Sequence, residues 1–456
     1  MSNATLQVGG GNWAAQDGKL LGYAVEPTSG RYLAREFTVN RNSSKWVLGS
    51  DGYLYEVPAD QPALEYYSDG TFRGALVEPQ SVNEAKASED LDNATYWTVT
   101  NTTIAGDTET DPKGGTNSFL LSETVANSTH LFIIASGHRT SIASGETWTH
   151  SIFLKKGDGI NAPDIVQISA AADVYGGTPY VNFNISTGAV LSSSNLTGRI
   201  RDYGNGWYRC SVTGTATNTA AQGYIAIVFT NNDDSLGRVP SYTGQTDANV
   251  FVWGAQLEQS PIATSYIPTT TGAVTRLKDD ISFTNASSVI GQSEGTLFVE
   301  VDWQLTSGTN QYILTASDGT ASNRLFIVNL SGVLSMYAQV NDVVITNQGE
   351  SSTSYSGIQK FAFAYKTDDF ELYRNGSSIS SDTSGSLASL ATLTDIDFGQ
   401  REAATIQANM WIRDARIYNT RLTDTQCQDL TSLDRWIFSE TTETFSNTNL
   451  IFNQYN

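Results

Sequence analysis

Apolar and polar residues alternate in short runs along most of this chain, whereas stretches with helical spacing are few and short. An alternation of period two places every second side chain on one face of a β-strand. Polar turns separate these runs between residues 76 and 272, in a pattern typical of a two-sheet sandwich. The predicted strands are 117–125, 130–136, 147–157, 164–172, 178–185, 206–214, 223–231 and 249–257.

A second series of alternating runs fills residues 290–430 and predicts a second sandwich. Just beyond its last strand, Thr423 and Gln426 have the spacing of a capping box, in which each side chain bonds the backbone N–H of the other residue. They predict the start of a short helix. The predicted strands lie within 295–305, 310–317, 323–332, 333–340, 358–377, 395–400 and 409–423.

Three further segments flank these two series. Residues 1–75 contain a predicted hairpin over Lys45–Pro58, and are interpreted either as an attachment segment or as an extension packed on its own domain. Residues 273–289 are predicted to be a linker, and the apolar side chains of residues 431–456 suit an interaction tail or a last strand. The predicted fold class is all-β, with two tandem antiparallel β-sandwich (jelly-roll) domains and an N-terminal β-hairpin-rich extension.

Charge and cysteine content narrow the classes of function. The chain has 26 basic and 47 acidic residues and a net charge of −21, so nucleic acid and anionic membranes are poor partners. Cys210 and Cys427 fall in separate predicted domains, so no disulfide framework is expected. We expect neither a signal peptide nor a membrane span, because no apolar run approaches the roughly 20 residues that a span needs.

Three segments in the first half of the chain resemble parts of one known domain, in the right order. They are Ser68–Ile104, Ile200–Gly214 and Val252–Arg276. They resemble the opening, a central strand pair and the closing segment of a carbohydrate-binding-module-like jelly roll. Asn205-Gly206 is predicted to form the tight turn of the strand pair. That domain is common in tailed-bacteriophage structural proteins, especially tail fibres and adhesins. The resemblance covers roughly residues 30–276 and implies a protein of the virion.

The second series resembles a concanavalin-A-like (laminin-G-like) lectin sandwich. Residues 361–376 are similar to the hairpin of that family in which a strand with the pattern x-L-Y-x-N-G follows a short acidic turn. Residues 411–430 are similar to its closing strand, turn and short helix. Because this fold hosts lectins, hydrolases and purely structural modules, the resemblance implies a sandwich without implying one activity.

Together, the two resemblances imply a non-enzymatic structural component of a tailed phage virion, made in the cytoplasm of the bacterial host. The favoured role is a tail fibre or adhesin that binds host surface glycans. One alternative is a head fibre or capsid decoration protein, and another is a glycan-degrading tailspike or glycoside hydrolase. The expected partners are other virion proteins of the tail, the portal-proximal region or the capsid, a host glycan, and further copies of the chain in a homotrimer.

The strongest catalytic candidate is the strand that carries Glu300, Asp302 and Gln304 on one face. Concanavalin-A-like glucanases use a similar strand, on which one carboxylate attacks the sugar and another donates a proton. In this chain Gln304 takes the place of the second glutamate, and an amide neither gives nor takes a proton at neutral pH. We therefore assign no catalytic residue and interpret the strand as structural.

Binding candidates come from aromatic residues and from carboxylate-rich loops. Aromatic faces stack on sugar rings, and calcium takes several oxygen ligands at flexible spacing. Solvated turns are the alternative for each loop, and the spacings of His130, His138 and His150 fit no zinc motif. The glycan-binding candidates are Trp97, Tyr175, Tyr180, Trp303, Tyr337 and Trp411, and the calcium candidates are Asp107, Glu109, Asp111, Asp233, Asp234, Asp368 and Asp369.

Overall fold

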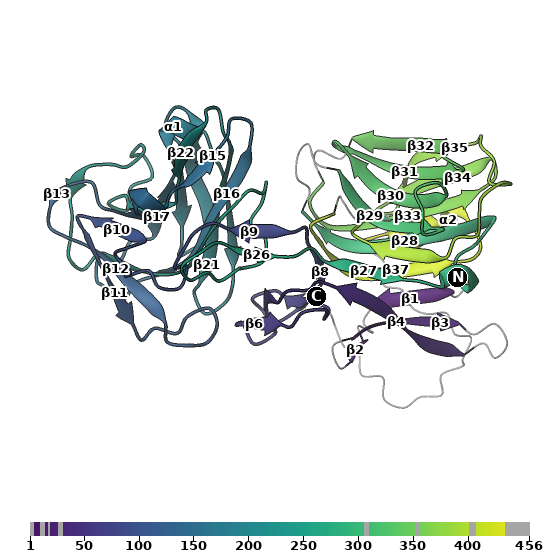
Figure 1. Cartoon of the computed structure of the whole chain (residues 1–456), viewed down its shortest axis with the longest axis horizontal. Helices are drawn as coiled ribbons and strands as arrows, with labels where there is room; N and C mark the ends of the chain where they lie inside the picture. The colour runs from purple at the N-terminus through teal and green to yellow at the C-terminus, as the bar shows by residue number, and fades with distance from the viewer. Residues whose placement is uncertain are drawn as a thin grey trace.

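The computed structural model describes residues 4–9, 14–16, 19–25, 31–304, 310–351, 355–400 and 407–433. These residues form two β-sandwiches that lie side by side (Figure 1). The all-β class with two antiparallel sandwiches is therefore confirmed. The α-helices in these ranges, α1 (Ala172–Tyr175) and α2 (Asp424–Thr431), are short, and no helix there has the length and apolar character needed to cross a membrane.

The first sandwich consists of two six-stranded antiparallel sheets around one apolar core. All eight strands predicted between residues 76 and 272 are present. The first sheet has the order β10 (Trp97–Thr100), β14 (Leu131–Ile134), β23 (Ala226–Phe229), β17 (Ile165–Ser169), β18 (Tyr180–Asn184), β19 (Ala189–Ser194). The second has the order β11 (Thr102–Asp107), β12 (Ser118–Glu123), β25 (Asn249–Glu258), β16 (Thr147–Lys156), β21 (Tyr208–Thr215), β20 (Thr197–Asp202).

Local sequence signals account for two details of these elements. Asn205 and Gly206 both have positive φ, and the Trp207 N–H donates to the Gly204 carbonyl, so the predicted tight turn joins β20 to β21. At the end of the second sandwich, the Thr423 hydroxyl accepts from the Gln426 N–H, and the Gln426 side chain accepts from the Thr423 N–H. The predicted capping box therefore starts α2.

The second sandwich consists of two larger sheets that β4 (Tyr32–Asn40) joins, because this strand pairs with both β3 and β27. A large apolar cluster fills the space between the sheets. The first sheet has the order β35 (Ser377–Asp382), β34 (Asp369–Arg374), β33 (Gly357–Lys366), β28 (Glu294–Trp303), β37 (Met410–Tyr418), β1 (Leu6–Gly9), β3 (Lys19–Val25), with β2 (Ala14–Gln16) also on β3. The second has the order β32 (Val343–Ser351), β31 (Val333–Val340), β30 (Arg324–Leu330), β29 (Gln311–Ser317), β36 (Asp395–Phe398), β27 (Asp280–Phe283), β4.

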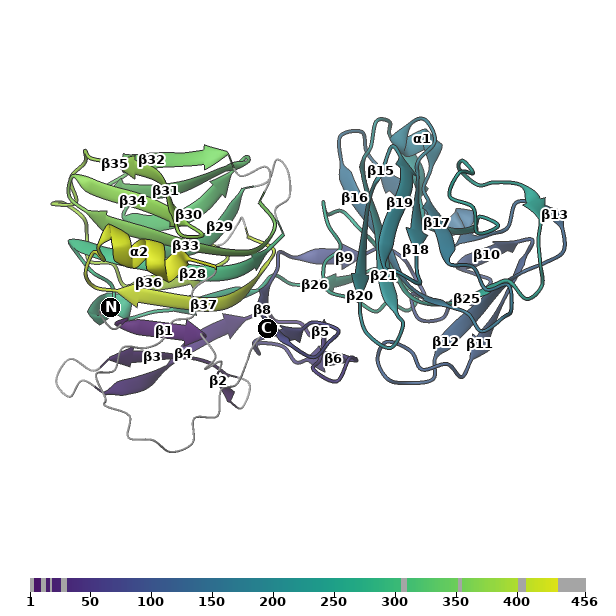
Figure 2. The same ribbon diagram turned by 180° about the vertical axis from the view of Figure 1, so that it is seen from behind.

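The first sandwich is an insertion in the second. Strands β1 and β8 (Phe72–Val77) both pair with β37, and β7 (Leu64–Tyr66) pairs with β8, so strands from residues 1–75 complete the second sandwich. This result supports the interpretation of an extension packed on a domain, although the domain is the second sandwich. The chain crosses to the first sandwich through β9 (Ser81–Asn83) and returns through β26 (Val274–Arg276), which pair with each other (Figure 2).

The domain boundaries of the structure differ from those expected from the sequence. The interval 273–289, predicted to be a linker, contains β26 and the edge strand β27. The tail residues Trp436, Phe438, Phe445, Ile451 and Tyr455 lie outside the described residues.

The predicted hairpin at Lys45–Pro58 lies between the sandwiches. It forms β5 (Lys45–Leu48) and β6 (Leu54–Val57), in the register Lys45 to Val57. Leu48 and Leu54 pack in a cluster with aromatic residues of the first sandwich. Val47 and Val57 pack in a different cluster with Trp411 of the second sandwich. The alternation of side chains along the hairpin thus lets it contact both domains.

A buried cluster of charged side chains connects this hairpin to the two chain segments that run between the sandwiches. The Asp279 carboxylate accepts hydrogen bonds from Arg41 Nη1 at 2.9 Å, from Lys45 Nζ at 2.5 Å and from the Glu78 N–H at 2.9 Å. Glu78 in turn lies 3.0 Å from Lys45 Nζ and 3.7 Å from Arg276 Nη2. All five side chains are at most 2% exposed.

Burial of these charges is tolerated because each one has a partner of opposite sign. Burial opposes the charged form of Glu78, but Lys45 and Arg276 outweigh it and hold the pKa of this carboxyl at about 2. The cluster joins Arg41 and Lys45 of the N-terminal segment to the exit at Glu78 and the return at Arg276 and Asp279. The cluster therefore determines where the chain leaves the second sandwich and where it returns from the inserted one.

We expect Asp279→Ala to lower the free energy of unfolding by about 3 to 5 kcal/mol, because it leaves buried cations without their common carboxylate. Urea denaturation followed by tryptophan fluorescence measures this loss. The matched control is Lys366→Gln, which removes an ion pair to Glu294 whose side chains are 56% and 38% exposed. The control should cost less than about 1 kcal/mol. Equal effects of the two substitutions would contradict a structural role for the cluster.

Candidate functional site

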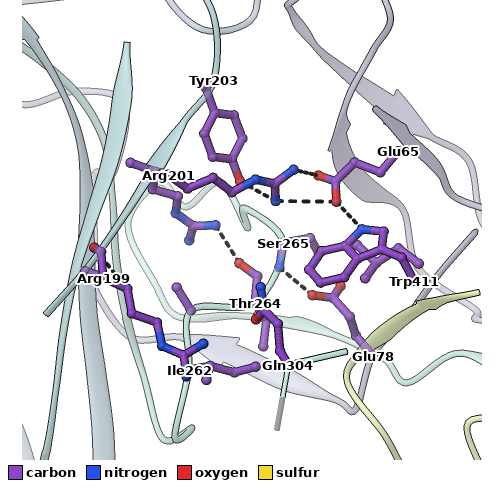
Figure 3. Close-up of a pocket in the computed structure, with 14 residues that line it drawn as sticks. Glu65, Glu78, Arg199, Arg201, Tyr203, Ile262, Thr264, Ser265, Gln304 and Trp411 are labelled. Carbon is purple, nitrogen blue, oxygen red and sulfur yellow. Dashed lines mark hydrogen bonds and ion pairs between the residues drawn. The ribbon is translucent and has the colours of Figure 1, made fainter. Parts of the chain in front are cut away.

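A cavity of about 60 Å³ lies where the two sandwiches meet. The outer face of the first sandwich supplies one wall, and the ends of β7, β8, β28 and β37 of the second sandwich supply the other (Figure 3). The lining combines charged side chains with polar and apolar ones. The lining residues are Glu65, Leu76, Glu78, Arg199, Arg201, Tyr203, Arg209, Ser211, Ile262, Ala263, Thr264, Ser265, Gln304 and Trp411.

Strand alternation explains why the arginines gather on this side. Arg199 and Arg201 are two residues apart on β20, so their side chains leave the same face of the sheet. The register places Arg209 of β21 opposite Arg201. Ile200, which lies between the two arginines of β20, packs against the core of the first sandwich. The polar face of this strand pair is thus directed at the second sandwich.

Arg201 is tied to the opposite wall through Glu65. Its Nη2 lies 3.2 Å from Glu65 Oε1, and Glu65 Oε2 also accepts a hydrogen bond from Trp411 Nε1. The guanidinium of Arg73 lies over the Trp411 ring at 3.3 Å. Burial disfavours the charge of Arg201, but Glu65 more than compensates and raises the pKa of this guanidinium. This wall is therefore a rigid set of paired charges.

Arg209, opposite Arg201 on the neighbouring strand, has a buried donor without a hydrogen-bond partner among the described residues. Arg209 Nη1 donates to the Thr264 carbonyl at 2.6 Å and Nη2 donates to Ser151 Oγ at 3.0 Å, but Arg209 Nε has no hydrogen-bond partner among the described residues. The Ser265 N–H donates to Glu78 Oε1 at 2.8 Å, and the Ser265 side chain also interacts with this carboxylate. Buried donors without a partner, such as Arg209 Nε, are uncommon in folded proteins and call for an explanation.

Arg199 differs from the other two arginines because it is exposed, whereas Arg201 is half-buried and Arg209 is buried. No described carboxylate contributes to the pKa shift of Arg199. Partial desolvation lowers the pKa of its guanidinium. The lining contains three arginines and two glutamates, so it carries one positive charge in a chain whose net charge is −21. This arrangement is suited to binding a small anionic or hydrogen-bond-accepting group.

The strand considered for catalysis is held by ion pairs. Glu300 Oε1 accepts from Arg413 Nε at 2.9 Å, and Glu300 Oε2 lies 3.6 Å from Lys360 Nζ. Asp302 is 5% exposed and its Oδ2 accepts from Arg73 Nε at 2.5 Å. These contacts agree with the structural interpretation of the strand. A carboxylate paired in this way is a poor nucleophile or proton donor for a sugar.

Most of the aromatic residues proposed as sugar platforms belong to the core. Trp97, Tyr175, Trp303 and Trp411 are each at most 3% exposed, so their rings present no open face to a sugar. Trp97, for example, stacks on Phe132 at 4.9 Å inside the first sandwich. Trp411 nevertheless lines the junction cavity.

Tyr180 and Tyr337, the remaining two candidates, are half-buried. They lie in different sandwiches, on β18 and β31, and Tyr337 stacks on Phe326 at 4.4 Å. The six aromatic candidates are therefore not brought together as one platform.

The first predicted calcium loop, around Asp107, Glu109 and Asp111, is closed by its own hydrogen bonds. Asp111 is buried and its two oxygens accept the backbone N–H groups of Lys113, Gly115 and Asn117. Glu109 pairs with Lys155 Nζ at 2.8 Å, and Asp107 accepts the Glu109 N–H. These carboxylates stabilise a turn, as the alternative interpretation stated.

The other two calcium loops are satisfied in a similar way. Asp233 accepts the N–H and hydroxyl of Ser235, and Asp234 accepts the Asn182 amide. Asp368 adopts a positive φ in the β33–β34 turn, and Asp369 pairs with Arg421 at 2.7 Å. No group of His, Cys, Asp and Glu that could hold a metal ion occurs in the part of the chain that the structure describes.

The three histidines are also separate. His130 contacts the Asn101 carbonyl, and the His138 ring packs against Tyr96. His150 is fully buried, with Nδ1 at 2.6 Å from the Tyr224 carbonyl and Nε2 at 2.7 Å from the Tyr175 hydroxyl. Since a carbonyl only accepts, Nδ1 carries a proton. Burial lowers the pKa of this imidazole and favours the neutral form, in which Nε2 accepts from Tyr175.

No motif in the sequence pointed to the residues of the cavity. Arg199, Arg201 and Arg209 stand in an alternating segment whose polar face was visible, but their partners Glu65 and Glu78 are far away in sequence. When one face of a predicted strand is apolar and the other is polar, the simplest interpretation is that solvent covers the polar face. Only the insertion of one sandwich in the other brings a second wall to this face.

Several solved structures match parts of this chain at low sequence identity. The CBM40 module of the Ruminococcus gnavus IT-sialidase covers 32% of this chain and 87% of its own length, at 13% identity and a TM-score of 0.28. The binding domain of Botulinum neurotoxin DC, in complex with SialylT, covers 33% and 39%, at 14% identity and 0.27. Domains LG4-5 of the mouse laminin alpha1 chain cover 70% and 93%, at 10% identity and 0.22. No family model and no curated protein matches the sequence.

Acid should destabilise the protein through His150. Burial lowers the pKa of this imidazole from 6.5 to about 4, so the folded state disfavours its protonation. The stability that neutral His150 contributes is therefore complete above about pH 6.5 and is lost as the pH falls from there through about 4, a change of about 3 kcal/mol. An NMR titration of the His150 ring should give a midpoint near 4, and His150→Gln should flatten the acid limb of the stability curve. A midpoint near 6.5 would contradict this environment.

Proposed function

We propose that this chain is a non-catalytic, glycan-binding structural protein, and that it serves as an appendage of a tailed phage virion. The observation that carries the proposal is the junction cavity, where donors from one sandwich face the wall of another. Sites built in this way between domains hold polar ligands through a few well-placed hydrogen bonds. Sugars present many acceptor oxygens to such donors.

A binding role without cleavage is supported by the contacts of Glu300 and Asp302. Glycoside hydrolysis needs two carboxyl groups that reach the sugar, one of them able to give up a proton. Here Arg413 and Lys360 hold Glu300, while Arg73 holds the buried Asp302. Gln304 at the end of the strand lines the cavity and supplies an amide in place of an acid.

The phage assignment is supported by the sequence resemblance, and its three segments contribute to the junction. Ser68–Ile104 supplies Glu78, Ile200–Gly214 supplies Arg201 and Arg209, and Val252–Arg276 supplies Thr264 and Ser265. A compact two-domain unit with a buried connection also suits a virion appendage that must present a binding surface at a fixed orientation.

A tail fibre or adhesin is the favoured role, and a head fibre or capsid decoration protein is the alternative. Electron microscopy of virions labelled on this protein distinguishes the two. Label at the tail supports the favoured role, and label spread over the capsid would replace it with the alternative.

We expect the protein to bind host surface polysaccharide and to release no oligosaccharide from it. The reason is that the described carboxylates of the β28 strand are committed to ion pairs. The measurement combines a pull-down on immobilised polysaccharide with an assay of new reducing ends. Retention without new reducing ends is the expected result, for the natural chain and for Glu300→Gln alike. Steady release that is lost in Glu300→Gln would point instead to a glycan-degrading tailspike.

A further inference from the structure

The junction cavity has a definite chemical preference, and its lining identifies the group that it accepts. We propose that it binds the carboxylate of an acidic sugar, such as a uronic acid residue of a surface glycan. This inference rests on the proposed glycan binding for the sugar, and on the lining residues for the carboxylate.

The first argument is the pair of arginines Arg199 and Arg209. Arg209 lines the cavity, and its buried Nε has no hydrogen-bond partner among the described residues. Arg199 adds an exposed guanidinium, and no described carboxylate contributes to its pKa shift. A ligand with two adjacent acceptor oxygens would satisfy these groups, and a guanidinium binds a planar carboxylate through two parallel hydrogen bonds.

The second argument is charge. Glu65 and Glu78 stand on the wall opposite the three arginines, so the lining carries only one net positive charge. One negative charge balances it, whereas a dianion such as a phosphate monoester would meet the field of both glutamates. The cavity therefore favours a carboxylate over a phosphate group.

The third argument is size. The cavity measures about 60 Å³, far below the roughly 300 Å³ at which pockets begin to enclose a whole small molecule. A carboxylate fits, while the sugar ring must stay outside. The half-buried Gln304 and Ala263 line the same cavity, and they offer an amide for ring hydroxyls and an apolar contact for the ring.

The test is isothermal titration calorimetry of the full chain at low ionic strength with glucuronic acid, glucose and sodium acetate as probes. We expect glucuronic acid to bind and glucose, which lacks the carboxylate, to give no measurable heat. Acetate should bind at least tenfold more weakly than glucuronic acid, because it lacks the ring. Acetate binding as tight as that of glucuronic acid would overturn the assignment to a sugar.

The site itself is tested by Arg199→Ala, which removes an exposed side chain without a described partner and should leave the fold intact. Affinity for glucuronic acid should fall at least tenfold, and Arg199→Lys should restore only part of it, because lysine keeps the charge but lacks the planar fork. Arg35→Ala, an exposed arginine on β4 of the other sandwich, is the charge-matched control and should bind as the natural chain does. Unchanged affinity in Arg199→Ala would overturn the site.

The two proposals fail in different ways. Retention on host polysaccharide without any binding of glucuronic acid would overturn the carboxylate site and leave the proposed function standing. Loss of both would overturn the proposed function as well.

Discussion

The buried carboxylate of Asp279 is the contact on which the arrangement of the whole chain depends. It lies where the chain returns from the inserted sandwich, and it receives hydrogen bonds from Arg41 and Lys45 of the N-terminal segment and from the backbone N–H of Glu78, where the chain leaves. The two oxygens of this carboxylate thus connect the segment before the insertion, the segment at its start and the segment that follows it. The crossing strands β9 and β26 are also joined by their own short ladder and by the bond from Arg276 Nη2 to the Pro79 carbonyl. The cost of burying five charges is repaid by mutual pairing, which also specifies one geometry.

That geometry creates the junction cavity. Glu78 belongs to both structures: one oxygen lies near Lys45 and Arg276 in the buried cluster, and the other accepts the Ser265 N–H at the cavity wall. The β5–β6 hairpin holds the same spacing through apolar contacts to each sandwich. A polar strand face that would be unremarkable on an isolated domain becomes one side of a site, because the insertion places Glu65 and Trp411 across from it. The arginines of the first sandwich supply the positive charge of the site, and the opposite wall reduces it to one net charge through Glu65 and Glu78.

Local signals in the sequence were sufficient to predict a turn, a helix start and the strands whose two faces differ in polarity. The Asn205-Gly206 turn, the capping box at Thr423 and the strands with a clear apolar face could all be predicted, because each depends on neighbours within a few residues. Edge strands such as β11 and β19 were missed, since both faces are largely polar or half-exposed. The insertion could not be predicted, because it rests on contacts such as that of Thr5 with Ile417, 412 residues apart. The burial of Trp97 and Trp303 likewise depends on which strands cover them, so the sequence could not show that these rings are closed to a sugar. The structural interpretation of the Glu300 strand agrees with the ion pairs found there.

Native-state hydrogen exchange of the full chain tests most directly whether the N-terminal strands and the second sandwich form one unit into which the first sandwich is inserted. Amides of β1 and β8 that pair with β37 should exchange as slowly as their β37 partners, because they open only when that sheet opens. Exchange should be measured at several urea concentrations, so that opening of one sandwich is separated from opening of the other. Rapid exchange of β1 and β8 while β37 stays protected would contradict the account and would make residues 1–75 an independent extension.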